Sequence, residues 1–173
     1  MNNKSNLDKN IVFIGLPGCG KTSIGKKVAE KLTLPFYDVD EYIEKKEGKQ
    51  IKEIFFKGEP YFRKLESQAI DEISENNLCV ISTGGGSVKD SSNMETLKQN
   101  SIIFFIKRPI ENIIQDIDIS TRPLLTEDMT KLYELYEERY PLYKKYSDIE
   151  ILNDTDFQEV VNKIVRLIES KLF

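Results

Sequence analysis

Residues 11–32 combine a short apolar run, a glycine-rich loop and an amphipathic helical pattern. The apolar run at 11–15 predicts a buried strand, and the spacing of apolar residues over 24–32 predicts a helix. The loop and first helical residues, Gly15–Thr22, match the pattern G-x-x-x-x-G-K-[ST]. In this pattern the loop N–H groups and the helix N-terminus together bind phosphate. A strand, this loop and a helix in that order predict an α/β fold.

The rest of the chain alternates short apolar runs with helical patterns. Strands are predicted at 34–37, 78–82, 102–106 and 150–152. Helices are predicted at 41–47, 51–57, from 59, from 109, at 128–146 and from 157 to the C-terminal residues. Residues 118–127 lose periodicity and predict a mobile loop. This alternation predicts one domain over residues 1–173, with a parallel sheet between two helical layers.

Composition excludes several classes of protein. The formal charge of −4 argues against a nucleic-acid binder. The first ten residues lack the apolar core of a signal peptide, and the longest apolar run, 102–106, is too short to span a membrane. We therefore expect a cytoplasmic protein with no membrane or nucleic-acid partner. Cys19 and Cys79 do not have the spacing of a zinc site or a disulfide scaffold. Because the chain has no His, catalysis must use carboxylates, Lys, Arg and the backbone.

The glycine loop predicts a nucleotide site. Lys21 is expected to reach the β- and γ-phosphates, and the Thr22 hydroxyl to bind Mg²⁺. The predicted nucleotide-binding residues are Gly18, Cys19, Gly20, Lys21, Thr22 and Ser23. A glycine-rich turn that merely precedes a helix is the alternative. Cys19 could be an oxidation-sensitive thiol, although a small side chain facing solvent or core is the simpler interpretation.

Four further motifs accompany the glycine loop. They are Phe36–Asp40, Gly58–Glu66, Thr83–Gly86, and the pair Arg122–Leu125 with Arg139–Tyr143. With the loop, they resemble the shikimate kinase family, from the loop to about residue 143. The resemblance implies a three-layer α/β/α P-loop kinase fold with a five-stranded parallel sheet. It also implies a flexible terminus at 1–9, an acceptor-binding region at about 38–75 and a mobile lid at about 113–127. The expected protein is a monomer that transfers the γ-phosphate of ATP to the 3-hydroxyl of shikimate.

Two aspartates lie two residues apart after the strand at 34–37. On a regular extended backbone both side chains would point to one side and share a site. The resemblance implies that Asp38 helps to hold the Mg²⁺ water shell and that Asp40 accepts a proton from the acceptor hydroxyl. The alternative for Asp40 is the N-cap of the helix that follows.

Arginine forks suit an acceptor that carries a carboxylate. The resemblance places Arg63 and Arg139 on the shikimate carboxylate, with Glu66 orienting the guanidinium of Arg63. A surface ion pair three residues apart would also explain Arg63 and Glu66. The resemblance further implies that Gly85 and Gly86 contact shikimate, although glycines also end strands.

The resemblance makes Arg122 the lid arginine, which stabilises charge on the phosphates. The lid nevertheless departs from the family. Residues 111–128 contain five acidic residues, and Arg122 is the only basic residue there. The family's adenine-stacking basic residue is missing from residues 113–118, and Lys107 and Arg108 lie earlier. We therefore expect weaker adenine contact or a more open lid.

Three alternatives remain open from the sequence. The chain could be a related kinase for gluconate or a nucleoside monophosphate, or a nucleotide-binding regulatory module without turnover.

Five tyrosines recur at helical spacing between 133 and 146, and core packing is a better explanation for them than base stacking.

Overall fold

Five strands form one parallel sheet in the computed structural model, which describes residues 9–116 and 130–172. The strands are β1 (Asn10–Ile14), β2 (Phe36–Asp38), β3 (Val80–Ser82), β4 (Ser101–Lys107) and β5 (Ile149–Leu152). Their spatial order is β2-β3-β1-β4-β5, and every neighbouring pair is parallel. All five carboxyl ends therefore lie along one edge, where ligands bind in open α/β sheets.

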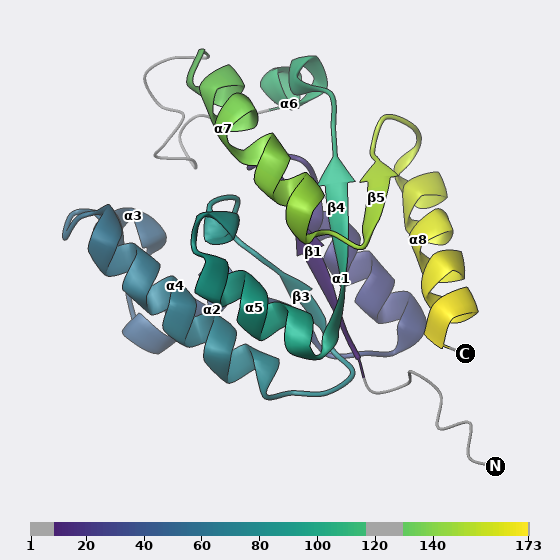
Figure 1. Cartoon of the computed structure of the whole chain (residues 1–173), viewed down its shortest axis with the longest axis horizontal. Helices are drawn as coiled ribbons and strands as arrows, with labels where there is room; N and C mark the ends of the chain where they lie inside the picture. The colour runs from purple at the N-terminus through teal and green to yellow at the C-terminus, as the bar shows by residue number, and fades with distance from the viewer. Residues whose placement is uncertain (1–8, 117–129, 173) are drawn as a thin grey trace.

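Helices cover both faces of this sheet (Figure 1). They are α1 (Lys21–Leu32), α2 (Val39–Glu47), α3 (Ile51–Phe55), α4 (Glu59–Ser74), α5 (Ser91–Gln99), α6 (Ile110–Asp116), α7 (Thr130–Tyr146) and α8 (Phe157–Leu172), with a 3₁₀ turn at Ser87–Lys89. Helices α1 and α8 pack together on one face, whereas α4, α5 and α7 lie on the other. The three-layer fold and the five-stranded sheet expected from the sequence are thus confirmed.

The core lies around the central strands. In β1, the residues from Ile11 to Ile14 are fully buried, and most of β4 is buried as well. Such continuous apolar runs are expected where helices cover both faces of a parallel sheet. At the start of β1, the buried Asn10 accepts from the backbone N–H of Cys79 over 3.1 Å, which ties the loop before β3 to the sheet.

The sequence located most elements to within a few residues. Gly48 adopts a φ of 64° at the end of α2, and Pro60 lies in the first turn of α4, as expected. The sequence analysis did not identify α5, in which only Met94 and Leu97 supply buried apolar side chains. The mobile loop expected at 118–127 lies outside the described residues, as do residues 1–8 of the flexible terminus expected at 1–9 and most of the expected lid.

The chain between Asp38 and Asp40 does not stay extended. Strand β2 ends at Asp38 and α2 begins at Val39, so the expected extended pair was wrong. Asp38 is the N-cap: its Oδ1 accepts from the backbone N–H groups of Asp40 and Glu41 over 3.0 and 3.1 Å. The capping role considered for Asp40 therefore belongs to Asp38, which leaves the Asp40 carboxylate available for another role.

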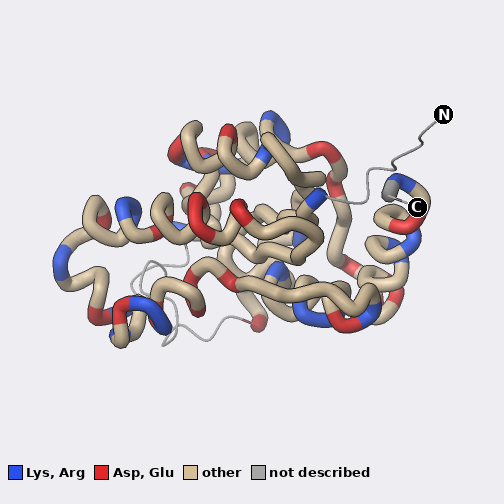
Figure 2. The backbone as a smooth tube through the Cα atoms, turned by 90° about the horizontal axis from the view of Figure 1, so that it is seen from below, with Lys and Arg blue, Asp and Glu red and all other residues tan. Residues whose placement is uncertain are grey.

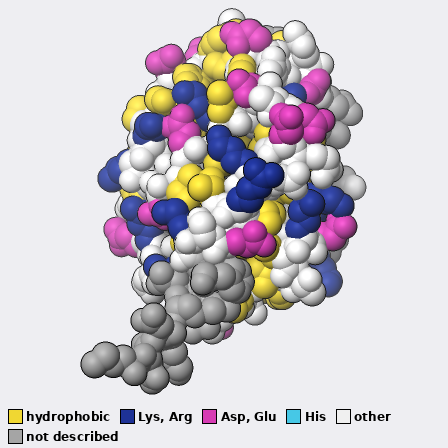
Figure 3. All heavy atoms as spheres, turned by 90° about the vertical axis from the view of Figure 1, so that its right-hand side faces the viewer, with side chains coloured by type: hydrophobic (Ala, Val, Ile, Leu, Met, Phe, Trp, Pro, Cys, Tyr) yellow, Lys and Arg dark blue, Asp and Glu magenta, His cyan; other side chains and the backbone are white. Residues whose placement is uncertain are grey.

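Charged residues of both signs are interspersed along the backbone (Figure 2). The face seen in Figure 3 likewise mixes basic, acidic and hydrophobic side chains. Among the described residues, no helix has the length and apolar character needed to cross a membrane.

Candidate active site

A cavity of about 580 Å³ opens near the carboxyl ends of β1, β2 and β3. Its walls come from the loop after β1, the start of α2, the segment from α3 to α4, the glycine turn after β3, and α7. The sequence-predicted residues that line it are Gly18, Gly20, Lys21, Thr22, Asp38, Asp40, Arg63, Gly85, Gly86 and Arg139. The fold therefore brings together predicted phosphate-binding and acceptor-binding residues that are far apart in the sequence.

The phosphate loop presents a buried lysine to this cavity. Lys21 is only 7% exposed, and its Nζ donates to the carbonyl oxygens of Gly15 and Leu16, each over 2.8 Å. Gly20 has a φ of 102°, and a Cβ there would lie 2.9 Å from Nδ2 of Asn153, so this turn requires glycine. The loop thus holds a positive charge beside the N-terminus of α1, where an anion is stabilised.

Two predicted nucleotide-binding residues do not line the cavity with their side chains. Cys19 is buried, which fits a small core-facing side chain rather than an exposed reactive thiol. Ser23 is exposed on α1. Their assignment to the nucleotide therefore stays a prediction about the backbone N–H groups of this turn.

Oxygen donors meet directly beside the phosphate loop. The Thr22 hydroxyl donates to Oδ2 of Asp38 over 2.6 Å and lies 3.4 Å from the Ser82 hydroxyl. Among the described residues, no group of three or more Asp, Glu, Cys or His side chains is arranged to hold a metal ion. A hydroxyl and one carboxylate are nevertheless a donor set that Mg²⁺ accepts, since this ion often takes its remaining ligands from water and phosphates.

Asp40 sits in an unusual electrostatic environment. Its Oδ1 is buried and has no hydrogen-bond partner in the described parts of the chain. Burial raises the pKa of this carboxyl to about 7, and the nearby charges of Asp38 and Glu66 add to the effect, whereas Lys21 and Arg63 oppose it. A carboxyl that titrates near neutral pH is suited to general-base catalysis.

Carboxylates fix Arg63 on the wall of the cavity. Its Nη1 donates to Oε2 of the fully buried Glu66 over 2.8 Å, and its Nε and Nη2 donate to Oε1 of Glu59 over 3.1 and 3.0 Å. The Ser87 hydroxyl donates to the other Glu66 oxygen over 2.6 Å. Because Glu66 is fully buried and held by two donors, the surface ion pair considered above is excluded. Glu59 and Ser87 were missed, although a Glu four residues before Arg63 is detectable from helical spacing.

Arg139 is a second guanidinium in this cavity, and it is 2% exposed. Its Nε and Nη1 are buried without a hydrogen-bond partner among residues 9–116 and 130–172. Helix α7 continues through Pro141, which cannot donate a backbone N–H. Buried charged donors without partners are costly, so Arg139 is prepared for an anionic ligand.

The glycine turn after β3 closes tightly on these groups. A Cβ on Gly84 would lie 2.6 Å from Glu66 Oε1, and one on Gly86 would lie 2.3 Å from Arg63 Nη2. On the other side of the turn, the Tyr143 hydroxyl donates to the Gly85 carbonyl over 2.6 Å. These glycines therefore do more than end a strand, because their size lets the backbone approach the two charged side chains.

Arg108 contacts the phosphate loop. Its Nη1 donates to the Gly18 carbonyl over 3.3 Å, and its Nη2 pairs with Asp116. Lys107 instead pairs with Glu150 over 3.4 Å. Of the two basic residues before the lid, Arg108 is thus the one beside the nucleotide loop.

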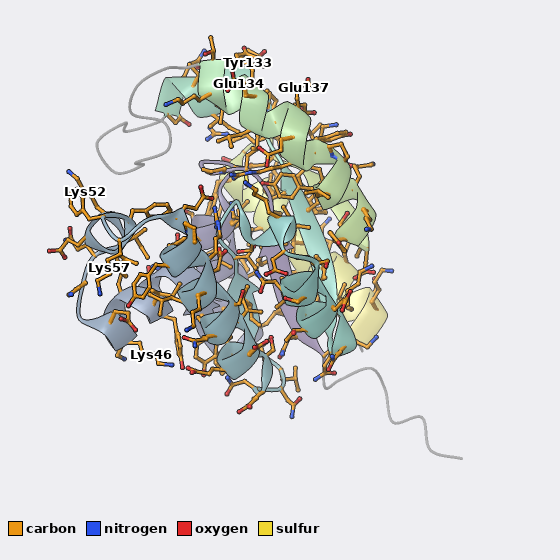
Figure 4. All side chains as sticks on the ribbon, turned by 60° about the vertical axis from the view of Figure 1, so that its left-hand side comes forward. Lys46, Lys52, Lys57, Tyr133, Glu134 and Glu137 are labelled. Atoms are coloured by element: carbon orange, nitrogen blue, oxygen red, sulfur yellow. The ribbon has the colours of Figure 1, made fainter. Side chains whose placement is uncertain are left out.

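The predicted lid arginine, Arg122, lies outside the described residues. Figure 4 labels lysines on the segment from α2 to α4, namely Lys46, Lys52 and Lys57, and Tyr133, Glu134 and Glu137 on α7. Lys52 is the labelled lysine that lines the cavity. The tyrosines of α7 divide: Tyr143 and Tyr146 are buried, whereas Tyr133 is exposed, so core packing accounts for only part of the series.

A family model, related sequences and a solved structure are all similar to this chain. The sequence model of the family described as shikimate kinase matches residues 17–169. Shikimate kinase of Clostridium beijerinckii is 46% identical over 166 residues, which cover 96% of this chain and 98% of the relative. Shikimate kinase of Clostridium botulinum is 48% identical over 161 residues, covering 92% and 98%. The structure of shikimate kinase from Acinetobacter baumannii in complex with shikimate superposes with a TM-score of 0.90 at 34% identity, covering 95% of each chain.

Proposed function

Because the chain belongs to the shikimate kinase family, we propose that it transfers the γ-phosphate of ATP to the 3-hydroxyl of shikimate in the cavity described above. The observation that carries this proposal is the pair of guanidinium groups of Arg63 and Arg139. One is held by carboxylates and the other is buried with unpaired donors among the described residues. Both share a cavity with the phosphate loop, so a carboxylate-bearing acceptor and a nucleotide can meet there.

Shikimate binds through charge and shape. Arg63 and Arg139 hold its carboxylate, and the backbone of Gly85 and Gly86 contacts the ring substituents. Asp40 faces the acceptor hydroxyl. Positioning of this kind accounts for much of phosphoryl transfer, because the reaction needs alignment and charge neutralisation more than covalent help from the protein.

Asp40 takes up the proton as the 3-hydroxyl oxygen forms its bond to the γ-phosphorus. The bond between that phosphorus and the bridging oxygen of ADP breaks, and shikimate 3-phosphate and ADP are released. A pKa of about 7 keeps a large fraction of Asp40 ionised at neutral pH while leaving it basic enough to accept a proton. Lys21 shifts its Nζ from the loop carbonyls to the β- and γ-phosphates and neutralises their charge.

Mg²⁺ fits the oxygen donors of Thr22 and Asp38, which lie beside the phosphate loop. When bound, this ion supplies neutralisation of the charge on the transferred phosphoryl group. Arg122 would cover the phosphates from the lid, and this role rests on its sequence motif alone. A cytoplasmic location and a monomeric state likewise remain predictions from the sequence.

A coupled assay of ADP release tests the proposal. Purified protein with ATP and Mg²⁺ is offered shikimate, gluconate or AMP in separate reactions, and turnover is expected with shikimate. Turnover confined to gluconate or AMP would replace the proposed acceptor. ATP binding without transfer to any of the three would indicate a regulatory module.

A further inference from the structure

Tyr143 joins α7 to the glycine turn after β3. Its side chain is fully buried, and its ring stacks on Phe105 with the centroids 5.0 Å apart and the planes at 26°. Its hydroxyl donates to the carbonyl oxygen of Gly85 over 2.6 Å. The ring is therefore fixed by packing, and the hydroxyl also interacts with the side chain of Arg139.

That hydrogen bond fixes the peptide between Gly85 and Gly86. The described chain has no cis peptide bond, so the Gly85 carbonyl and the Gly86 N–H point in opposite directions. With the carbonyl held toward Tyr143, the N–H of Gly86 points away from α7. Within the described residues, neither the Gly85 nor the Gly86 N–H donates to another group.

The freed N–H belongs to a residue that lines the cavity and contacts an arginine. Gly86 lies so close to Arg63 that a Cβ there would be 2.3 Å from Nη2. Because glycine has no Cβ, the peptide groups on either side of it can adopt many orientations that differ little in energy. A pair of adjacent glycines therefore needs an external contact to hold one orientation.

We propose that Tyr143 is a positioning residue for acceptor binding. Its hydroxyl holds the Gly85–Gly86 peptide in one orientation, with the Gly86 N–H directed away from α7. In this orientation the Gly86 N–H donates a hydrogen bond to the bound acceptor. The inference rests on the proposed acceptor site and adds to it the residue that orients one of its donors. Tyr143 itself does not touch the acceptor.

The environment keeps the Tyr143 hydroxyl a donor throughout the useful pH range. Burial raises the pKa of Tyr143, and the positive charge of Arg139 together with a hydrogen bond to its side chain opposes that rise only in part. The same helix thus supplies an anion-binding guanidinium and, four residues later, the hydroxyl that orients the glycine turn.

Tyr143→Phe is the test, because it removes the hydroxyl and keeps the ring stacked on Phe105. We expect KM for shikimate to rise roughly tenfold, as one oriented hydrogen bond is lost, with kcat and KM for ATP within about twofold of wild type. The matched control is Tyr140→Phe: Tyr140 also packs against Phe105, but its hydroxyl accepts from Lys107 over 3.5 Å instead of donating to a glycine carbonyl. This control should leave KM for shikimate unchanged.

A merely structural role would produce a different pattern. A fall in kcat together with similar rises in the KM values for shikimate and ATP would overturn the inference. So would a wild-type KM for shikimate in a folded Tyr143→Phe protein. Absence of shikimate turnover by the wild type would instead refute the proposed function. The two failures are thus distinguishable.

A second measurement does not depend on kinetics. In protein labelled with ¹⁵N-glycine, shikimate should shift the Gly86 amide resonance of the wild type and of Tyr140→Phe strongly. The shift should be reduced in Tyr143→Phe at saturating shikimate. A Gly86 amide that does not respond to shikimate in the wild type would also overturn the inference, even if the Phe variant proved too unstable to assay.

Discussion

Arg63 and Glu66 lie one helical turn apart on α4, and Nη1 of Arg63 donates to Oε2 of Glu66 over 2.8 Å. The Glu66 side chain is fully buried. The Ser87 hydroxyl holds the other Glu66 oxygen. The guanidinium is thus oriented before an acceptor arrives, which lowers the entropic cost of recognising a carboxylate.

Arg63→Ala should chiefly weaken acceptor binding. We expect KM for shikimate to rise on the order of 100-fold, with KM for ATP little changed, because a partly desolvated charge pair is lost. Steady-state kinetics with each substrate varied measure this. Arg166→Ala, at an exposed position on α8, is the control and should behave as wild type. Unchanged shikimate kinetics in Arg63→Ala would remove Arg63 from the acceptor site.

Arg139→Met should separate stability from binding. In the free protein, the buried Nε and Nη1 lack partners among the described residues, so an apolar side chain of similar length should leave the unfolding midpoint unchanged or higher. The rise in midpoint that shikimate causes in the wild type should be largely lost. Thermal unfolding with and without shikimate checks both effects. A variant that keeps the full shikimate-induced rise would contradict the role of Arg139 in the site.

Asp40 should control the acidic side of the pH profile. Because its pKa is raised to about 7, kcat/KM should fall about tenfold per pH unit below that value, as the carboxyl takes up a proton. Asp40→Asn should abolish this dependence together with nearly all activity. The exposed Asp154→Asn should change neither. A profile flat from pH 5 to 8 in the wild type would argue against Asp40 as the base.

The same carboxyl should reduce stability at neutral pH. Between its ordinary value of 3.8 and about 7, the folded chain binds more protons than the unfolded chain, so the free energy of unfolding falls as pH rises through this window. Asp40→Asn should therefore raise the unfolding midpoint at pH 8, by roughly 5 °C, and have a much smaller effect near pH 4. Calorimetry at the two pH values measures the difference. An equal shift at both would mean that titration of Asp40 is not its cause.

Lys21→Ala should abolish transfer without unfolding the chain. We expect kcat to drop at least about a thousandfold, since the lysine charge is needed most as charge develops on the phosphates. Circular dichroism should remain that of the wild type. Lys27→Ala is the control on the same helix, where Lys27 pairs with Glu30 at the surface. Substantial turnover by Lys21→Ala would refute the assignment of the phosphate loop.

Thr22→Val should weaken dependence on Mg²⁺ rather than acceptor binding. The substitution keeps the shape of the side chain but removes the hydroxyl that lies 2.6 Å from Asp38. We expect the Mg²⁺ concentration for half-maximal rate to rise roughly tenfold, with KM for shikimate little altered. Thr96→Val, on α5, is the control. An unchanged Mg²⁺ titration would exclude the Thr22 hydroxyl from the metal site.

Local sequence was sufficient where a function depends on neighbouring residues. The glycine loop, the helix after it and the stop at Gly48 follow from backbone conformation and helical spacing, which contiguous residues set. The sequence did not predict helix α5, because its pattern contains few buried apolar residues. It also did not predict the turn at Asp38, because an aspartate at a helix N-cap and an aspartate at the end of a strand have the same sequence pattern.

The sequence by itself determined the alternation of strands and helices, the phosphate loop and which charged residue types are available to an acceptor. Only the tertiary structure decided that Arg63 and Arg139 share one cavity, that Asp40 titrates near neutral pH, and that Tyr143 holds the glycine turn. The physical reason is that burial and long-range contacts set these properties. Both arise when parallel strands bring distant loops to one edge of the sheet, and neither is encoded in the spacing of neighbouring residues.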